Sequence, residues 1–150
     1  MSHPHRPVPP TLKERNAVQK IVDQLLDELA PERVLKRADR PPVTIEAHRT
    51  PSGCVLQGPT EALSVSWFAD ATDQATLGEL QIVVWKGVVS RRGATRPSTN
   101  AVVVSELVLR PVERPADECV WRADDGTLFD GARLAAHCLA LLEGQRDETM

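Results

Sequence analysis

Two apolar segments, LQIVVWKGVVSR at residues 80–91 and AVVVSELVLR at residues 101–110, decide the fold. Both are rich in β-branched residues, and turn-forming residues lie between them, so they predict two long antiparallel strands. Within these segments, Ile82 to Trp85 and Ala101 to Val104 are apolar without alternation. Because successive side chains of a strand point to opposite faces, we expect both faces of the sheet centre to be covered, by helices, by more sheet or by another subunit.

Shorter strands are predicted on both sides of this pair. VTIEAHRT and CVLQG should form a hairpin around PSG, in which Thr50 pairs with Cys54 and His48 lies near Leu56. EALSVSWFA alternates between apolar and small polar residues, as a strand with one buried face does. CVWRA is a shorter strand, and DATDQAT is a loop.

A helix is predicted at each end of the strand region. Thr11 and Glu14 have the spacing of a capping box, and Pro31 ends the apolar stripe that follows. ERVLKR should add a further turn of helix before Pro41 and Pro42 force an extended chain. The residues of the first stripe are Val18, Ile21, Val22, Leu25, Leu26 and Leu29, and those of the C-terminal stripe are Leu134, Cys138, Leu141 and Leu142.

These elements predict an α+β domain with an N-terminal helix, a curved antiparallel sheet of about five to six strands and a C-terminal helix. If both helices lie on one face of the sheet, the other face needs either sheet curvature or a partner chain. Residues 11–144 are expected to form this single domain. Residues 1–10, which contain four prolines, are expected to be a disordered tail, and residues 145–150 a short flexible one.

Composition excludes several classes of protein. The chain has 150 residues and a net charge of −3, which gives no overall attraction to nucleic acid or anionic lipid. Apolar runs long enough to span a membrane are absent, as is an N-terminal signal pattern, so we expect a cytoplasmic protein. Cys54, Cys119 and Cys138 share no C-x-x-C spacing and are expected to be reduced thiols. No metal site and no cofactor are predicted.

Residues 124–131, DDGTLFDG, contain the D-G-T-L sequence with which haloacid dehalogenase-like phosphatases begin their active site. In those enzymes the first aspartate of D-x-D attacks phosphorus. Alignment puts that nucleophile at Ala123, so the attacking carboxylate is missing. We therefore predict a two-residue hairpin turn at Asp125 and Gly126, and a helix cap at Asp130.

Other candidate catalytic groups are isolated. His48 near Glu46, with Cys54 across the turn, could form a nucleophilic pair, but a strand histidine is the simpler interpretation. The chain contains no G-x-S-x-G, P-loop, G-x-G-x-x-G or H-E-x-x-H motif. Enzymatic activity is therefore disfavoured.

Two groups of residues are candidates for partner binding. Arg91, Arg92 and Arg96 lie in the connection between the two long strands, where they could contact phosphates or an acidic partner. The other candidates are Trp67 and Trp85. Since Trp67 and Phe68 are adjacent on a strand, one of the two should be exposed.

The first functional hypothesis is a non-catalytic interaction module, an adaptor or accessory subunit that could form a homodimer through its sheet. The second is a small-molecule-binding or hydrolytic domain whose pocket lies between the curved sheet and the C-terminal helix and contains His48 or Glu46. The third is phosphate or nucleic-acid contact through the Arg91–Asn100 loop. It is the weakest of the three hypotheses, because the chain has more acidic than basic residues.

Overall fold

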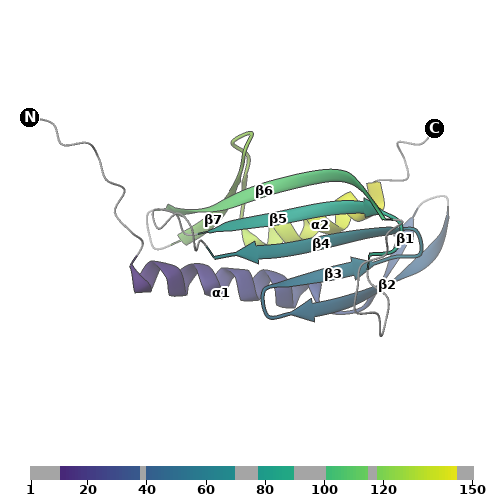
Figure 1. The fold of residues 1–150 in the computed structure, drawn as a ribbon, viewed down its shortest axis with the longest axis horizontal. Coiled ribbons are helices and arrows are strands. Elements are labelled where there is room, and N and C mark those ends of the chain that lie inside the picture. Colours follow the sequence, from purple (N-terminus) through teal and green to yellow (C-terminus); the bar gives the residue numbers. More distant parts are fainter. Residues whose placement is uncertain (1–10, 38–39, 70–77, 90–100, 115–117, 145–150) are drawn as a thin grey trace, which may run out of the picture.

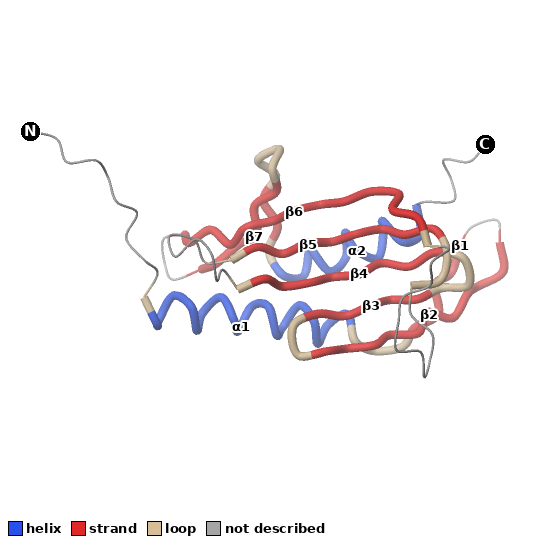
Figure 2. Tube along the Cα trace, viewed as in Figure 1, coloured by secondary structure: helices blue, strands red, loops and turns tan. Residues whose placement is uncertain are grey.

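The computed structural model describes residues 11–37, 40–69, 78–89, 101–114 and 118–144. Over these residues the chain forms one helix, eight antiparallel strands that are neighbours in chain order, and a second helix (Figures 1 and 2). The elements are α1 (Leu12–Leu29), β1 (Arg33–Arg37), β2 (Arg40–Thr50), β3 (Gly53–Gln57), β4 (Glu61–Phe68), β5 (Glu79–Lys86), β6 (Val102–Arg114), β7 (Glu118–Ala123), β8 (Leu128–Phe129) and α2 (Gly131–Gly144). The predicted α+β class is confirmed, with more strands than expected.

Helix α1 forms as its sequence predicts. The Thr11 hydroxyl accepts a hydrogen bond from the Glu14 backbone N–H at 3.1 Å, and the Glu14 carboxylate accepts one from the Thr11 N–H at 3.1 Å. This capping box satisfies two N–H groups that a helix start leaves without partners. Five of the six predicted stripe residues are buried, and Ile21 is half-buried against them.

Helix α2 begins at the predicted cap. The Asp130 carboxylate accepts a hydrogen bond from the Arg133 N–H at 2.7 Å, and the Asp130 carbonyl accepts the first helical bond, from Leu134 N–H, at 2.9 Å. The side chains that follow at helical spacing, Leu134, Cys138 and Leu142, are buried. The cap therefore sets the start of the helix whose apolar stripe closes the core.

Replacing Asp130 by alanine should lower the free energy of unfolding by about 1 kcal/mol, because it removes the cap. Asp124→Ala is a matched control, since Asp124 is exposed in the preceding turn. Urea unfolding followed by circular dichroism measures both changes. Equal stability of the Asp130 variant and the wild type would contradict the capping role.

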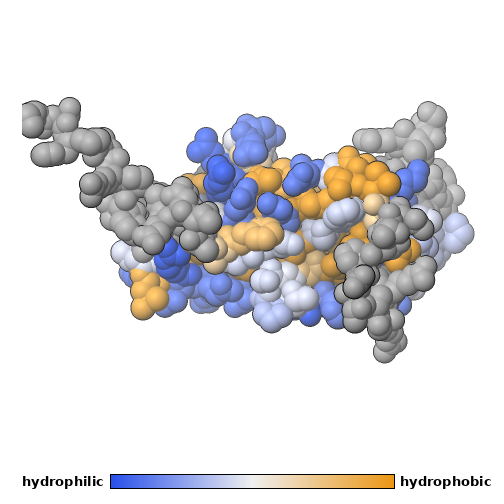
Figure 3. All heavy atoms as spheres, viewed as in Figure 1, coloured by the Kyte–Doolittle hydropathy of each residue, from blue (hydrophilic) through white to orange (hydrophobic). Residues whose placement is uncertain are grey.

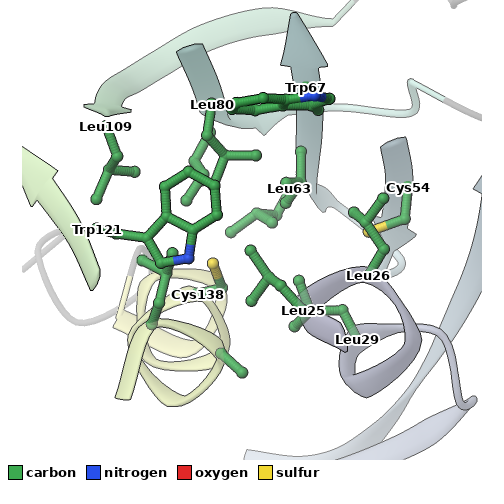
Figure 4. Close-up of a cluster of buried hydrophobic side chains, with 14 of the residues drawn as sticks. Leu25, Leu26, Leu29, Cys54, Leu63, Trp67, Leu80, Leu109, Trp121 and Cys138 are labelled. Atoms are coloured by element: carbon green, nitrogen blue, oxygen red, sulfur yellow. The ribbon is translucent and has the colours of Figure 1, made fainter. Parts of the chain in front are cut away.

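Both helices pack on the same face of the curled sheet, which we call the inner face (Figure 1). Leu63, Val65 and Trp67 of β4 lie on this face, opposite residues of β5 that are also buried. Figure 4 shows the sheet side chains converging with those of α1 and α2. The core therefore occupies the space between the sheet and the two helices, and we call the opposite side of the sheet the outer face.

The segment after α1 corrects one prediction. ERVLKR was expected to add helix, but residues 33–37 form the strand β1, in which Val34 pairs with Thr44 and Leu35 with Val43. The Arg33 guanidinium donates to the carbonyls of Glu28 and Pro31, at 2.9 and 3.2 Å, and so closes the end of α1. Pairing with the long strand β2 decides the conformation of this segment, and sequence reasoning on local periodicity did not include that partner.

The first hairpin is confirmed, but its predicted register was wrong by one residue. Thr50 pairs with Gly53, and His48 pairs with Val55 instead of lying near Leu56. The turn uses two residues, Pro51 and Ser52, where three were expected. A shift of one residue moves a side chain to the other face of a sheet, so His48 lies on the outer face.

The two long strands also have different ends from those predicted. β5 stops at Lys86, because Gly87 has a φ of 114° and the chain leaves the ladder there. β6 begins at Val102 and continues past the predicted end at Arg110 to Arg114. The predicted loop at residues 70–76 lies outside the described residues, as do the two predicted tails.

Candidate functional site

The outer face of the sheet has an apolar end and a charged end. At one end, Trp85 of β5 is opposite Val103 of β6, and Val104 is the extra residue of a β-bulge. Val103 and Val104 are 49% and 45% exposed, and we call Val83, Trp85, Val103 and Val104 the outer patch. Figure 3 shows apolar side chains gathered on this face over the start of β6 and hydrophilic ones toward β7. Among the described residues, neither helix covers this face.

The charged end contains two cationic side chains that repel each other. Arg110 of β6 is directly opposite Arg122 of β7, and both are exposed. The structure shows no ion pair for either arginine within the part of the chain that it describes. Glu79 of β5 precedes Leu80, which pairs with Leu109, so Glu79 lies beside Arg110, and Glu106 is opposite Val83 of the outer patch. Like charges directly opposite on neighbouring strands are destabilising. Glu79 lies on the Arg110 side of this pair, so Arg122 is the arginine farther from a carboxylate of the sheet.

The predicted partner residues Trp67 and Trp85 lie on opposite faces. Trp67 is 7% exposed in the core, where its ring meets that of Trp121 edge to face, with centroids 5.8 Å apart. Its neighbour Phe68 is 51% exposed, so the exposed member of the adjacent pair is the phenylalanine. Trp85 is half-buried on the outer face, and its indole N–H donates to the Ser64 hydroxyl at 2.9 Å. Because Trp85 lies on the outer face and Trp67 in the core, Trp85 is the better candidate for contact with a partner.

A buried glutamine holds the chain where it leaves β5. The Gln57 side-chain amide donates to the carbonyls of Gly58 and Gly87 at 2.7 and 3.2 Å, and its oxygen accepts from the Val89 N–H at 2.8 Å. This clamp fixes residues 87–89 against the end of β3. The arginine connection begins directly after them. Arg91, Arg92 and Arg96 themselves lie outside the described residues, so their contact with phosphates or nucleic acid stays a prediction.

The possible Cys54–His48 pair does not form. Cys54 is buried on the inner face, opposite Arg49, whereas His48 is exposed on the outer face. Burial raises the pKa of the Cys54 thiol to about 11 and that of Cys138 to about 12. Both thiols are therefore protonated at neutral pH and are not activated nucleophiles.

Residues 124–131 form a turn and the predicted helix cap. The turn has three residues, Asp124 to Gly126, between the paired Ala123 and Thr127, where a two-residue turn at Asp125 and Gly126 was expected. Gly126 has a φ of 90°, and the Asp125 carboxylate accepts a hydrogen bond from the Thr127 N–H at 2.9 Å. Hydrogen bonds from the Thr127 side chain and backbone hold the pKa of Asp125 below its ordinary value. The carboxylate thus stabilises the β7–β8 turn, which accounts for the D-G-T sequence without phosphoryl chemistry.

A cleft of about 720 Å³ lies between the two helices. The residues that line it are Ile21, Gln24, Leu25, Asp27 and Glu28 of α1, Trp121 of β7, and Asp130, Gly131 and Ala132 at the start of α2. The predicted pocket was placed between the sheet and the C-terminal helix and was expected to contain His48 or Glu46. Both of these residues are exposed on β2, on the outer face, so that part of the prediction was wrong.

Trp121 is the residue of this cleft that sequence reasoning missed as a binding residue. Its side chain is 1% exposed, and its indole nitrogen is buried without a hydrogen-bond partner in the structure. Leaving a buried N–H unpaired costs about 1–3 kcal/mol, so such groups are uncommon. The sequence signal was the alternation of CVWRA, which predicts burial of the ring but not the state of its N–H.

The rim of the cleft is acidic. Asp27, Glu28 and Asp130 contribute carboxylates, and no lysine or arginine is among the lining residues. The Asp27 carboxylate forms an ion pair with Arg49, with 2.9 Å between Oδ1 and Nε, and the Asp130 carboxylate caps α2. The exposed side chain of Glu28 therefore has the least engaged carboxylate of the three.

Two further findings concern the described residues alone. In the ranges that the structure describes, no cluster of three or more histidine, cysteine, aspartate or glutamate side chains is placed to hold a metal ion. The helices of the same ranges are too short or too polar to cross a membrane.

Comparison of the chain with models of protein families, with curated proteins and with solved structures finds no match. The geometry of the outer face and of the cleft is therefore the basis for the function proposed below.

Proposed function

We propose that this protein is a non-catalytic interaction module that associates through the outer face of its sheet, and that its partner is a second copy of the same chain. The observation that carries the proposal is the outer patch. Its valines and Trp85 lie side by side on a face that neither helix covers. Exposed apolar side chains grouped on one face of a sheet are typical of interfaces.

The charges on the outer face support a second copy of the chain as the partner that binds there. The outer face holds both a cationic pair, Arg110 and Arg122, and the carboxylates of Glu79 and Glu106. In a two-fold contact the same surface of each copy meets the other in opposite orientation. Such a contact can bring the arginines of one copy against the carboxylates of the other while the outer patches meet near the axis. It would relieve the repulsion between Arg110 and Arg122.

The experiment measures the mass of the untagged chain by native mass spectrometry and by light scattering at micromolar concentration. The wild type is expected to have twice the chain mass of 16.5 kDa. Val104→Asp places a charge in the outer patch and should give a monomer, because a buried unpaired carboxylate strongly disfavours association. Val104 is already 45% exposed, so the fold should tolerate the change.

Leu12→Asp is the matched control. Leu12 is 74% exposed at the start of α1, away from the sheet, and an acidic residue in the first turn suits a helix. This variant should keep the mass of the wild type. A monomeric wild type, or a Val104→Asp variant that stays dimeric, would contradict association through the outer face.

A further inference from the structure

The cleft between α1 and α2 combines an unpaired buried donor with an acidic rim. Figure 4 shows the six-membered ring of Trp121 toward Trp67 and Leu80, and its nitrogen on the opposite side, toward the two helices. Trp121 also lines the cleft. An indole N–H can only donate a hydrogen bond. The missing partner is therefore an acceptor. Because the nitrogen is buried, an acceptor that enters from the cleft reaches it only when the side chains around the indole shift.

We propose that this cleft binds a small organic cation that carries a hydrogen-bond acceptor. The acceptor meets the Trp121 N–H, and the cationic group meets the rim carboxylates, above all Glu28. Ile21, Leu25 and Ala132 supply apolar wall for the body of the ligand. The volume of about 720 Å³ is in the range of small-molecule sites.

The charge of the rim excludes the opposite ligand class. An anion would face the carboxylates of Glu28 and Asp130, whereas Asp27 is already paired with Arg49, and no lysine or arginine is among the lining residues. The N-terminus of α2 does not offset this, because Asp130 already accepts the N–H of Arg133. A neutral ligand could satisfy Trp121 but would gain nothing from the exposed carboxylate of Glu28.

The cleft is separate from the proposed dimer interface. The cleft residues come from α1, β7 and the start of α2, on the inner side of the sheet, whereas the proposed interface is the outer face. Val104→Asp should therefore leave binding in the cleft unchanged.

The test uses the indole N–H signals of uniformly ¹⁵N-labelled full-length protein, one from each of its three tryptophans. Histamine is the probe, because its ring nitrogen is an acceptor and its amine is cationic. Two matched probes each lack one feature: 2-phenylethylamine has the amine without the ring acceptor, and imidazole-4-acetate has the acceptor with a carboxylate. Trp121→Phe assigns the signal of Trp121 by its disappearance.

Histamine is expected to move the Trp121 signal saturably and to leave the signals of Trp67 and Trp85 in place. Each matched probe should bind roughly tenfold or more weakly, since each lacks one charged or hydrogen-bonded contact. Glu28→Gln should weaken histamine binding by roughly tenfold. Glu106→Gln, which removes an exposed carboxylate from the outer face, should leave it unchanged.

Three results would overturn the proposal. One is a Trp121 signal that histamine does not move at millimolar concentration, as expected if an ordered water satisfies the N–H. Another is binding of imidazole-4-acetate as tight as that of histamine. The third is equal histamine affinity of the wild type and Glu28→Gln. Because Trp121→Phe retains a buried aromatic ring, calorimetric loss of histamine affinity in this folded variant gives a second measurement of the same contact.

Discussion

Replacing Trp67 by alanine is expected to lower the free energy of unfolding by about 3–5 kcal/mol. The indole is 7% exposed on the inner face of β4, between the sheet and the ring of Trp121, whose plane is inclined to it by 74°. Alanine would remove the edge-to-face contact and leave a cavity that paired strands on both sides of β4 cannot close. Urea unfolding monitored by circular dichroism measures the loss.

Trp85→Ala is the matched comparison, because the same side chain is removed from the other face of the sheet. It should lower the free energy of unfolding by only about 1–2 kcal/mol, since the ring is half-buried and gives up one hydrogen bond, to Ser64. It should also raise the dissociation constant of the proposed dimer by roughly tenfold or more, as removal of an interface tryptophan typically does. Similar stability losses for the two variants would contradict their placement on opposite faces.

This contrast shows what the sequence could predict about the two tryptophans. Alternation along EALSVSWFA correctly grouped Trp67 with Leu63 and Val65 on one face, because a strand repeats every two residues. The same alternation places Phe68 on the face of Ser64 and Ser66, and Phe68 is the exposed member of the pair. The position of Trp85 was harder to predict, because its strand is apolar on both faces and which face is covered depends on where the helices lie.

The helices and the turns were predictable from local chemistry. The capping box at Thr11, the cap at Asp130 and the turn at Asp125 and Gly126 each depend on hydrogen bonds within three residues of chain. Local sequence therefore determines them. Strand β1 and the register of the first hairpin depend on pairing with other segments, and the structure corrects both predictions.

The cleft between the helices could not be predicted from the sequence, for a similar reason. Glu28 and Asp130 are more than a hundred residues apart in the chain, and as single residues they are typical of a solvated helix face and of a helix cap. They line one cleft because both apolar stripes pack on the same face of the sheet, which sets α1 beside α2. The sequence left open whether the helices would share a face.

Gly78→Ala is expected to lower the free energy of unfolding by about 3–5 kcal/mol, from two sources that add. Gly78 precedes β5 with a φ of 118°, a conformation that side chains other than glycine rarely adopt. A Cβ atom there would also lie 2.6 Å from the Trp67 ring and 2.7 Å from the carbonyl oxygen of Phe68. The ring is confined by the core and the carbonyl belongs to a strand, so neither can move away freely.

Alanine variants of two further glycines allow the backbone strain at Gly78 to be distinguished from the steric clash of its new Cβ atom. Gly126 has a φ of 90° but open space around its Cβ position, so Gly126→Ala should show the backbone strain alone, about 1–2 kcal/mol. Gly131, at the start of α2, has open space and no positive φ, and its replacement by alanine should leave stability unchanged or slightly higher. Urea unfolding of the three variants measures the series.

The clash with the indole can be tested further by combining Gly78→Ala with Trp67→Leu. Leucine lacks the ring atoms that the new Cβ atom would meet, so the double variant should be more stable than the sum of the two single losses predicts. Strict additivity would mean that Gly78 does not support the packing of Trp67. In that case the loss in Gly78→Ala would come from the backbone and from Phe68, and the close approach of β5 to the core tryptophan would have to be reconsidered.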